Sequence, residues 1–192
     1  MNTFFCRAFQ CCFAVGARFL SWRTPQVFSG EGSLLRAADI LRENALRRPF
    51  VIASRRQCAD EHFRALQEKL DEQDILLSIF SSVEPNPSVE TVEKIAAQYK
   101  IDSCDCFLVI GGGSPMDSAK AIALLAVSDI ERKNLFDGNI GNKALPMIHI
   151  PTTAGTGSEV TPYAILTNRE KQTKKSIASP CLFPTYALLD AK

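Results

Sequence analysis

The sequence predicts an α/β fold in which a parallel β-sheet is covered by helices on both faces. Strand-like runs alternate with helical patterns over most of the chain, and this alternation is typical of parallel sheets with helical crossovers. Two of the runs, Phe107 to Ile110 and Met147 to Ile150, are short and almost wholly apolar, as expected for strands that are buried on both faces. Each of them leads into a segment rich in glycine and other small residues.

The individual elements follow from the same pattern, in chain order. Short apolar runs predict strands at residues 26–28, 50–54, 75–80, 106–110, 147–150 and 163–167. Longer segments of mixed polar and apolar residues predict helices between them, at residues 33–44, 57–72, 88–100 and 114–127. Residues 170–175 are rich in charge and predict a hairpin-like loop, for which a solvated turn is the plainest interpretation.

Composition indicates one folded domain without a broad nucleic-acid surface. The 192 residues are 46% hydrophobic and 22% charged, which is close to globular averages and allows a sizeable core. Lys and Arg total 22 against 21 Asp and Glu, so the net charge of +1 predicts no nucleic-acid partner. The seven cysteines show no repeated metal-binding spacing. Reduced thiols in a cytoplasmic protein are therefore expected, in preference to disulfides or a metal site.

The first 24 residues differ in character from the rest. They contain arginines but no acidic residue, with phenylalanines between them. A helical extension over residues 1–24 that docks on a domain of residues 25–192 is the favoured interpretation, and an organellar presequence is the alternative. No stretch of about 18 uninterrupted apolar residues occurs, so no membrane span is expected.

The glycine run after the strand at 106–110 predicts an anion site. Gly111, Gly112 and Gly113 leave no Cβ between the main chain and a ligand. Ser114 is a favoured N-cap, and Asp117, three residues later, would complete a capping box. The free N–H groups of the following helix would then point toward bound phosphate. An ordinary tight strand-to-helix turn is the alternative, since the run matches neither the Gly-x-Gly-x-x-Gly nor the Walker pattern.

A second loop strengthens that prediction. Residues 151–159 follow the strand at 147–150 and are dense in hydroxyls, with Thr152, Thr153 and Thr156 between small residues. Such a loop offers side-chain donors and unhindered backbone amides. Two loops that each follow a buried parallel strand are expected to meet at the carboxyl edge of the sheet, where open α/β folds bind ligands. A polar surface loop is the alternative.

Together, Gly-Gly-Gly-Ser-Pro-Met-Asp-Ser-Ala-Lys at 111–120 and Pro-Thr-Thr-Ala-Gly-Thr-Gly-Ser-Glu-Val-Thr at 151–161 resemble the metal-dependent, or iron-containing, alcohol dehydrogenase family. That family shares its architecture with dehydroquinate synthase and glycerol dehydrogenase. The resemblance extends to a first strand and glycine turn at 28–33, a Pro-Asn-Pro turn around Asn86, and a basic pair, Lys174 and Lys175. It implies a Rossmann-like domain with a parallel sheet, of the dehydroquinate synthase-like N-terminal type.

The resemblance also implies a pyridine dinucleotide and a small alcohol or carbonyl substrate, between which a hydride is transferred. The cofactor-binding residues that it implies are Gly111, Gly112, Gly113, Ser114 and Asp117 at the pyrophosphate, Thr152, Thr153, Thr156 and Lys174 at the ribose and nicotinamide, and Asn86 and Arg55 at the adenosine.

One departure from the dinucleotide pattern bears on the choice of cofactor. The strand at 50–53 ends in Ser54, Arg55 and Arg56, with Arg55 at the position expected for an acidic residue that binds the ribose 2′-hydroxyl. A guanidinium binds a 2′-phosphate, which a carboxylate repels. NADP(H) is therefore predicted over NAD(H). Solvent exposure of both arginines without any such role is the alternative.

The length of the chain limits what the resemblance implies. The family holds Fe²⁺ or Zn²⁺ with one Asp and three His of a C-terminal helical domain, which is absent from these 192 residues. His62 is expected to be solvated and His149 to be a core residue, so neither is expected to bind metal. The resemblance thus implies the cofactor-binding half of an alcohol dehydrogenase, inactive alone, with homo-oligomerisation or complementation by a C-terminal half as options.

Two alternatives stay open. A non-catalytic nucleotide-binding module would keep the fold without the reaction. A relative of glycerol or glycerol phosphate dehydrogenase, or of dehydroquinate synthase, would keep the fold and change the substrate.

Overall fold

A six-stranded parallel sheet forms the centre of the protein. The structure, a computed structural model, describes residues 7, 24–127, 135–136, 143–169 and 172–191. Every neighbouring pair in the sheet is parallel, and the strand order is β1-β8-β5-β4-β2-β3. The strands are β1 (Gln26–Ser29), β2 (Pro49–Ile52), β3 (Ser78–Phe80), β4 (Cys106–Gly111), β5 (Met147–Pro151) and β8 (Tyr186–Leu189).

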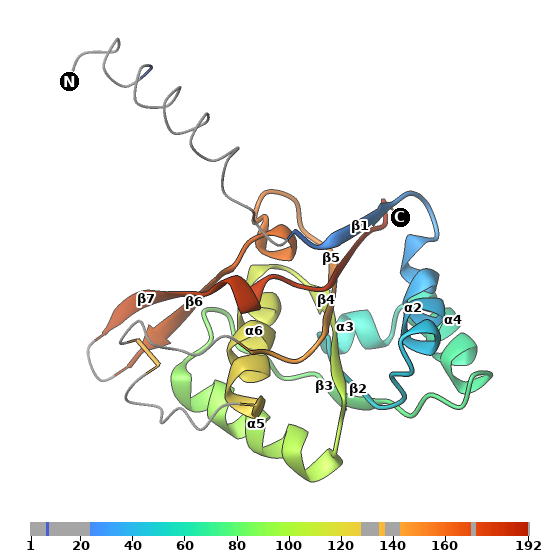
Figure 1. Ribbon diagram of the computed structural model, residues 1–192, viewed down its shortest axis with the longest axis horizontal. Helices are drawn as coiled ribbons and strands as arrows, with labels where there is room; N and C mark the ends of the chain where they lie inside the picture. Colours follow the sequence, from blue (N-terminus) through green and yellow to red (C-terminus); the bar gives the residue numbers. More distant parts are fainter. Residues whose placement is uncertain (1–6, 8–23, 128–134, 137–142, 170–171, 192) are drawn as a thin grey trace.

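Helices cover both faces of this sheet, which confirms the predicted fold class (Figure 1). On one face lie α2 (Arg36–Glu43), α3 (Arg55–Cys58) and α4 (Glu61–Asp71), and on the other lie α5 (Val89–Asp102) and α6 (Gly113–Val127). The central strands alternate between the two resulting cores. Phe107 and Val109 of β4 pack with α5 and α6, whereas Leu108 and Ile110 pack with α2 and α4. Burial on both faces explains the continuous apolar runs.

A two-stranded antiparallel hairpin stands apart from the main sheet. It consists of β6 (Tyr163–Asn168) and β7 (Thr173–Ala178) and contacts α6. The strand predicted at 163–167 therefore exists but does not join the parallel sheet. Alternate residues of β6 are buried and exposed, since only one face of the hairpin packs on the domain. The loop predicted at 170–175 is shorter than expected, because Lys174 and Lys175 already belong to β7.

The helix predicted at 57–72 is two helices. Ser54 caps α3, accepting a hydrogen bond from the Gln57 backbone while the Gln57 side chain bonds back to Ser54. Asp60 then caps α4, accepting a bond from the His62 backbone. Two capping residues six positions apart end one helix and start another, a signal that outweighs the continuous helical composition.

Other boundaries differ by less. The strand predicted at 75–80 is reduced to β3, although Ile75 is buried. The helix predicted at 33–44 opens with a 3₁₀ turn, Ser33–Leu35, before α2. The helix predicted at 88–100 is α5, and Ser88 is its N-cap. No strand was predicted at residues 186–189, yet β8 lies between β1 and β5.

The histidine predicted for the core is confirmed. His149 on β5 is fully buried, and neither ring nitrogen has a hydrogen-bond partner among the described residues. Burial, with the nearby Lys120 ammonium, lowers the pKa of this imidazole well below its ordinary value. The ring is therefore neutral at pH 7.

The described cysteines are unpaired thiols. They are Cys58, Cys104, Cys106 and Cys181, and none of these four forms a disulfide with another described residue. Burial raises the pKa of Cys104 to about 11, so this thiol is protonated at neutral pH. The extension predicted at residues 1–24 lies, apart from Arg7 and Thr24, outside the described residues. In the described part of the chain, no helix has the length and apolar character needed to cross a bilayer.

Candidate functional site

The two glycine-rich loops meet at the carboxyl edge of the sheet, as predicted. They leave the neighbouring strands β4 and β5, and the Thr152 N–H donates to the Gly111 carbonyl over 2.9 Å. A Cβ built on Gly112 would lie 2.8 Å from Thr153 Oγ1, and one on Gly113 would lie 3.4 Å from Thr156 Cγ2. The two loops are thus in contact. The backbone of the first loop can approach the second this closely because glycine has no Cβ.

Helix α6 begins immediately after β4. It starts at Gly113, and a Cβ on Gly111 would lie 2.5 Å from Pro115 Cγ in its first turn. The missing side chain at Gly111 lets the helix start directly at the sheet edge. Its first N–H groups have no partner within the helix and carry the positive end of the helix dipole. This arrangement can bind an anion.

The predicted capping box at the start of this helix is wrong. Ser114 is the second helical residue, and its Oγ accepts a hydrogen bond from the Asn86 backbone over 3.2 Å. The Asp117 carboxylate accepts bonds from Ser158 Oγ, over 2.8 Å, and from the Ile165 N–H, over 3.1 Å. Contacts with distant segments therefore replace the local cap. Burial raises the pKa of Asp117, and the Ser158 hydrogen bond opposes that effect.

A buried lysine that the sequence analysis did not single out holds the second loop in place. Lys120 on α6 has no solvent exposure, and its ammonium donates to Ser158 Oγ at 3.0 Å, Thr161 O at 2.8 Å and Tyr163 O at 2.7 Å. Burial lowers its pKa to about 8, while the nearby carboxylates of Asp117 and Glu159 act in the opposite direction. A lysine inside an otherwise apolar helical run is a signal that could have revealed it.

A cavity of about 840 Å³ opens on the side of β2. Thr152 and Thr153 line it, together with Ser54, Arg56 and Gln57. The Gln57 side-chain amide donates to Thr152 Oγ1 over 2.9 Å, so the α3 capping residues touch the second loop. Arg56 lines this cavity, whereas Arg55, the residue predicted to bind the adenosine, is not among its lining residues.

A second cavity, of about 580 Å³, lies between the first loop and the hairpin. The predicted residues that line it are Asn86, Gly113, Ser114, Asp117, Thr156 and Lys174. Lys174 Nζ donates to Asn86 Oδ1 over 2.7 Å. Asn86 was predicted to share the adenosine side with Arg55, but the structure places it in this second cavity.

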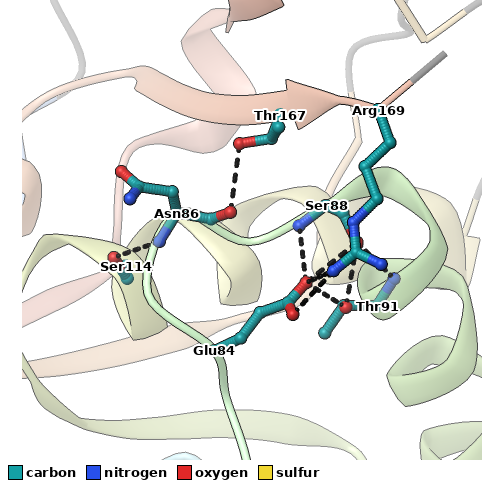
Figure 2. Close-up of polar contacts among 7 residues, drawn as sticks. All are labelled: Glu84, Asn86, Ser88, Thr91, Ser114, Thr167 and Arg169. Atoms are coloured by element: carbon teal, nitrogen blue, oxygen red, sulfur yellow. Dashed lines mark hydrogen bonds and ion pairs between the residues drawn. The ribbon is translucent and has the colours of Figure 1, made fainter. Parts of the chain in front are cut away.

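The turn that carries Asn86 is fixed by its neighbours (Figure 2). Asn86 adopts the left-handed region, with φ of 54°, which asparagine tolerates better than most other residues with a side chain. Thr167 on β6 holds the turn from one side, since its N–H donates to Pro87 O over 2.9 Å and its hydroxyl donates to Asn86 O over 3.0 Å. Ser114 holds it from the other side.

The described residues do not fit a metal ion. No group of three or more His, Cys, Asp or Glu side chains among them could hold one. His62 is exposed at the start of α4, as predicted, with its Nδ1 3.0 Å from Asp60 Oδ1.

A parallel sheet with helices on both faces and two small-residue loops at its carboxyl edge defines the class of α/β proteins that bind ligands at that edge. Within this class, the chain belongs to the iron-containing alcohol dehydrogenase family, whose model matches residues 24–191.

Individual relatives agree with this assignment. The chain is 34% identical over 167 residues to alcohol dehydrogenase 4 of Saccharomyces cerevisiae, covering 86% of this chain and 44% of that protein. Among solved structures it is similar to a 1,3-propanediol oxidoreductase, with a TM-score of 0.83, 27% identity and coverage of 90% and 46% of the two chains. A sulfoacetaldehyde reductase from Bifidobacterium kashiwanohense in complex with NAD⁺ has a TM-score of 0.79, 30% identity and the same coverage. The chain thus spans less than half of these relatives.

Proposed function

We propose that this chain is the NAD(P)(H)-binding part of an alcohol dehydrogenase that acts on a small alcohol or carbonyl substrate. The observation that carries the proposal is the close packing at the sheet edge, where a Cβ on Gly112 would collide with Thr153 of the second loop and a Cβ on Gly111 would collide with Pro115 of α6. The glycines keep a helix N-terminus and a row of threonines open at one edge of the sheet. The relative in complex with NAD⁺ supports a pyridine dinucleotide as the ligand.

The residues present fit such a cofactor, which when bound supplies a nicotinamide that gives or takes a hydride. The start of α6, Ser114 and Lys174 would bind phosphate oxygens, because they combine helix N–H groups, a hydroxyl and a positive charge. Thr152, Thr153 and Thr156 would donate to the sugar hydroxyls and the nicotinamide side. Asp117 would not contact the cofactor directly, because its oxygens already accept two hydrogen bonds. It would instead help to position Ser158.

The complete reaction is proposed to need more than these residues. The chain spans 44% and 46% of the relatives compared with it, and its described residues do not fit a metal ion. The proposal includes that the 192-residue chain is inactive alone and functions with a C-terminal half or in an oligomer. A cytoplasmic location stays a prediction.

Binding of dinucleotide by the 192-residue chain tests the proposal. Titration with NADPH and NADH, followed by the fluorescence of the reduced nicotinamide, is expected to give saturable binding that ATP displaces only weakly. Equal binding of ATP would instead favour the non-catalytic nucleotide module. Alcohol oxidation by the chain with added Fe²⁺ or Zn²⁺ would contradict the inactivity of the chain alone.

The preference for NADP(H) is proposed to depend on Arg56. Arg56 lines the larger cavity beside Ser54 at the end of β2, and its guanidinium can bind a 2′-phosphate in two-pronged geometry. Arg56→Gln is expected to weaken NADPH binding by about tenfold and to leave NADH binding unchanged, since one charge-assisted contact is lost. Arg55→Gln is the matched control and is expected to change neither affinity. Tighter binding of NADH than NADPH by the unaltered chain would contradict the preference.

A further inference from the structure

The Glu84 carboxylate links its own turn and the adjacent start of α5 to Arg169, which is 85 positions away in the sequence (Figure 2). Its Oε1 accepts hydrogen bonds from Thr91 Oγ1 at 2.6 Å, Ser88 Oγ at 2.9 Å and the Ser88 N–H at 3.3 Å. Arg169, directly after β6, donates through one nitrogen to both carboxylate oxygens at 2.9 and 2.8 Å. Hydrogen bonds, led by that of Thr91, lower the pKa of Glu84, so it is ionised at neutral pH. The Asn86 turn and the start of α5 are thereby tied to the hairpin.

These contacts lead directly to the second cavity. The turn between Glu84 and Ser88 contains Asn86 in its left-handed conformation. The Asn86 side-chain oxygen accepts from Lys174 Nζ at 2.7 Å, and its backbone N–H donates to Ser114 Oγ at 3.2 Å. Asn86 therefore orients both the ammonium and the hydroxyl that face this cavity. The hydrogen bonds of Thr167 and Ser114 hold this turn in place.

We propose that Glu84 and Arg169 form a clamp that positions Asn86, and through it Lys174 and Ser114, to bind a phosphate group in the second cavity. The inference rests on the proposed function, in which that phosphate belongs to the dinucleotide. Neither Glu84 nor Arg169 is among the residues that line the cavity, so both are positioning residues. The Arg169 side chain is 58% exposed, and a pair as open as this contributes little to folding on its own. Its effect is on the geometry of the turn.

Two substitutions test the clamp from its two ends. Glu84→Gln keeps an acceptor for Ser88 and Thr91 but removes the charge that holds Arg169. Arg169→Gln removes the other charge at an exposed position, where unfolding is not expected. Each is expected to weaken dinucleotide binding by about fivefold, less than the loss of a whole charge-assisted contact, with an unchanged melting temperature. Arg169→Lys is expected to restore most of the affinity, and Glu68→Gln on α4 is the matched control.

Combination with Lys174→Met separates positioning from a general structural role. If the clamp acts through Lys174, Glu84→Gln is expected to have little further effect on dinucleotide affinity once Lys174 is replaced. The clamp would be overturned if the losses of dinucleotide affinity multiplied fully in the double variant. It would also be overturned if the single variants bound dinucleotide as tightly as the unaltered chain.

A second readout does not depend on the dinucleotide. Acetic anhydride labelling, followed by mass spectrometry, is expected to modify Lys174 more slowly than the exposed Lys100, because the Lys174 ammonium is held by Asn86. In Glu84→Gln and Arg169→Gln, labelling of Lys174 is expected to rise by about threefold, as for one lost hydrogen bond, while that of Lys100 stays the same. Unchanged Lys174 labelling would overturn the clamp. If the unaltered chain binds no dinucleotide but Lys174 labelling still rises in the two variants, the proposed function is refuted and the clamp is supported.

Discussion

Lys120→Met is expected to lower the free energy of unfolding by about 3–5 kcal/mol, as when one partner of a buried charged network is removed. The ammonium uses its three N–H groups on Ser158 Oγ, Thr161 O and Tyr163 O, at distances of 3.0, 2.8 and 2.7 Å. Methionine has a similar length but no donor, so it leaves two carbonyls and a hydroxyl without this partner. It also removes the positive charge near Asp117.

Urea unfolding followed by circular dichroism measures this loss. Lys94→Met is the matched control, because Lys94 lies on α5 with an exposed side chain, and it is expected to change stability by less than about 0.5 kcal/mol. Dinucleotide affinity of the folded Lys120→Met chain is expected to fall as well, since Lys120 holds the second loop against α6. A stability within about 1 kcal/mol of the unaltered chain would show that the buried ammonium costs as much in desolvation as its hydrogen bonds return.

The fold class and the meeting of the loops could be predicted because their signals are local. An apolar run of four residues indicates a strand buried on both faces, whichever segments pack against that strand. Glycines at 111–113 indicate that another segment or a ligand comes close to the backbone, wherever that segment lies in the sequence. The two loops then meet because adjacent parallel strands end at the same edge.

The details of the site depend on contacts between distant segments, which no local pattern contains. Ser114 has the residue type of an N-cap, but its hydroxyl accepts from Asn86, which is 28 positions away. Glu84 and Arg169 are separated by 85 positions and meet only because β6 returns beside the turn. Such pairs are set by tertiary structure.

The choice between Arg55 and Arg56 has the same origin. Both follow β2, and Arg55 was predicted from its position in the dinucleotide pattern alone. Once Ser54 caps α3, the two side chains stand on a helix, where neighbours point about 100° apart. Only Arg56 then lines the larger cavity.

Gly111→Ala is expected to cost about 2–3 kcal/mol of stability, within the range for overpacking a tight contact, and to weaken dinucleotide binding. The new Cβ would lie 2.5 Å from Pro115 Cγ, and the proline ring cannot rotate away because it is part of the backbone. Relief would require the first turn of α6 to move from the end of β4. That movement would shift the helix N–H groups proposed to bind phosphate.

The double variant Gly111→Ala/Pro115→Ala tests this cause. Removing the ring leaves the residue 115 Cβ, 3.4 Å from the new methyl group, as the nearest remaining contact, so about half of the lost stability is expected to return. Gly113→Ala is the matched control, because its Cβ would meet Thr156 no closer than 3.4 Å. If the losses of Gly111→Ala and Pro115→Ala simply add in urea unfolding, the Pro115 contact is not the reason for glycine here. The start of α6 would then owe its position to the rest of the first loop.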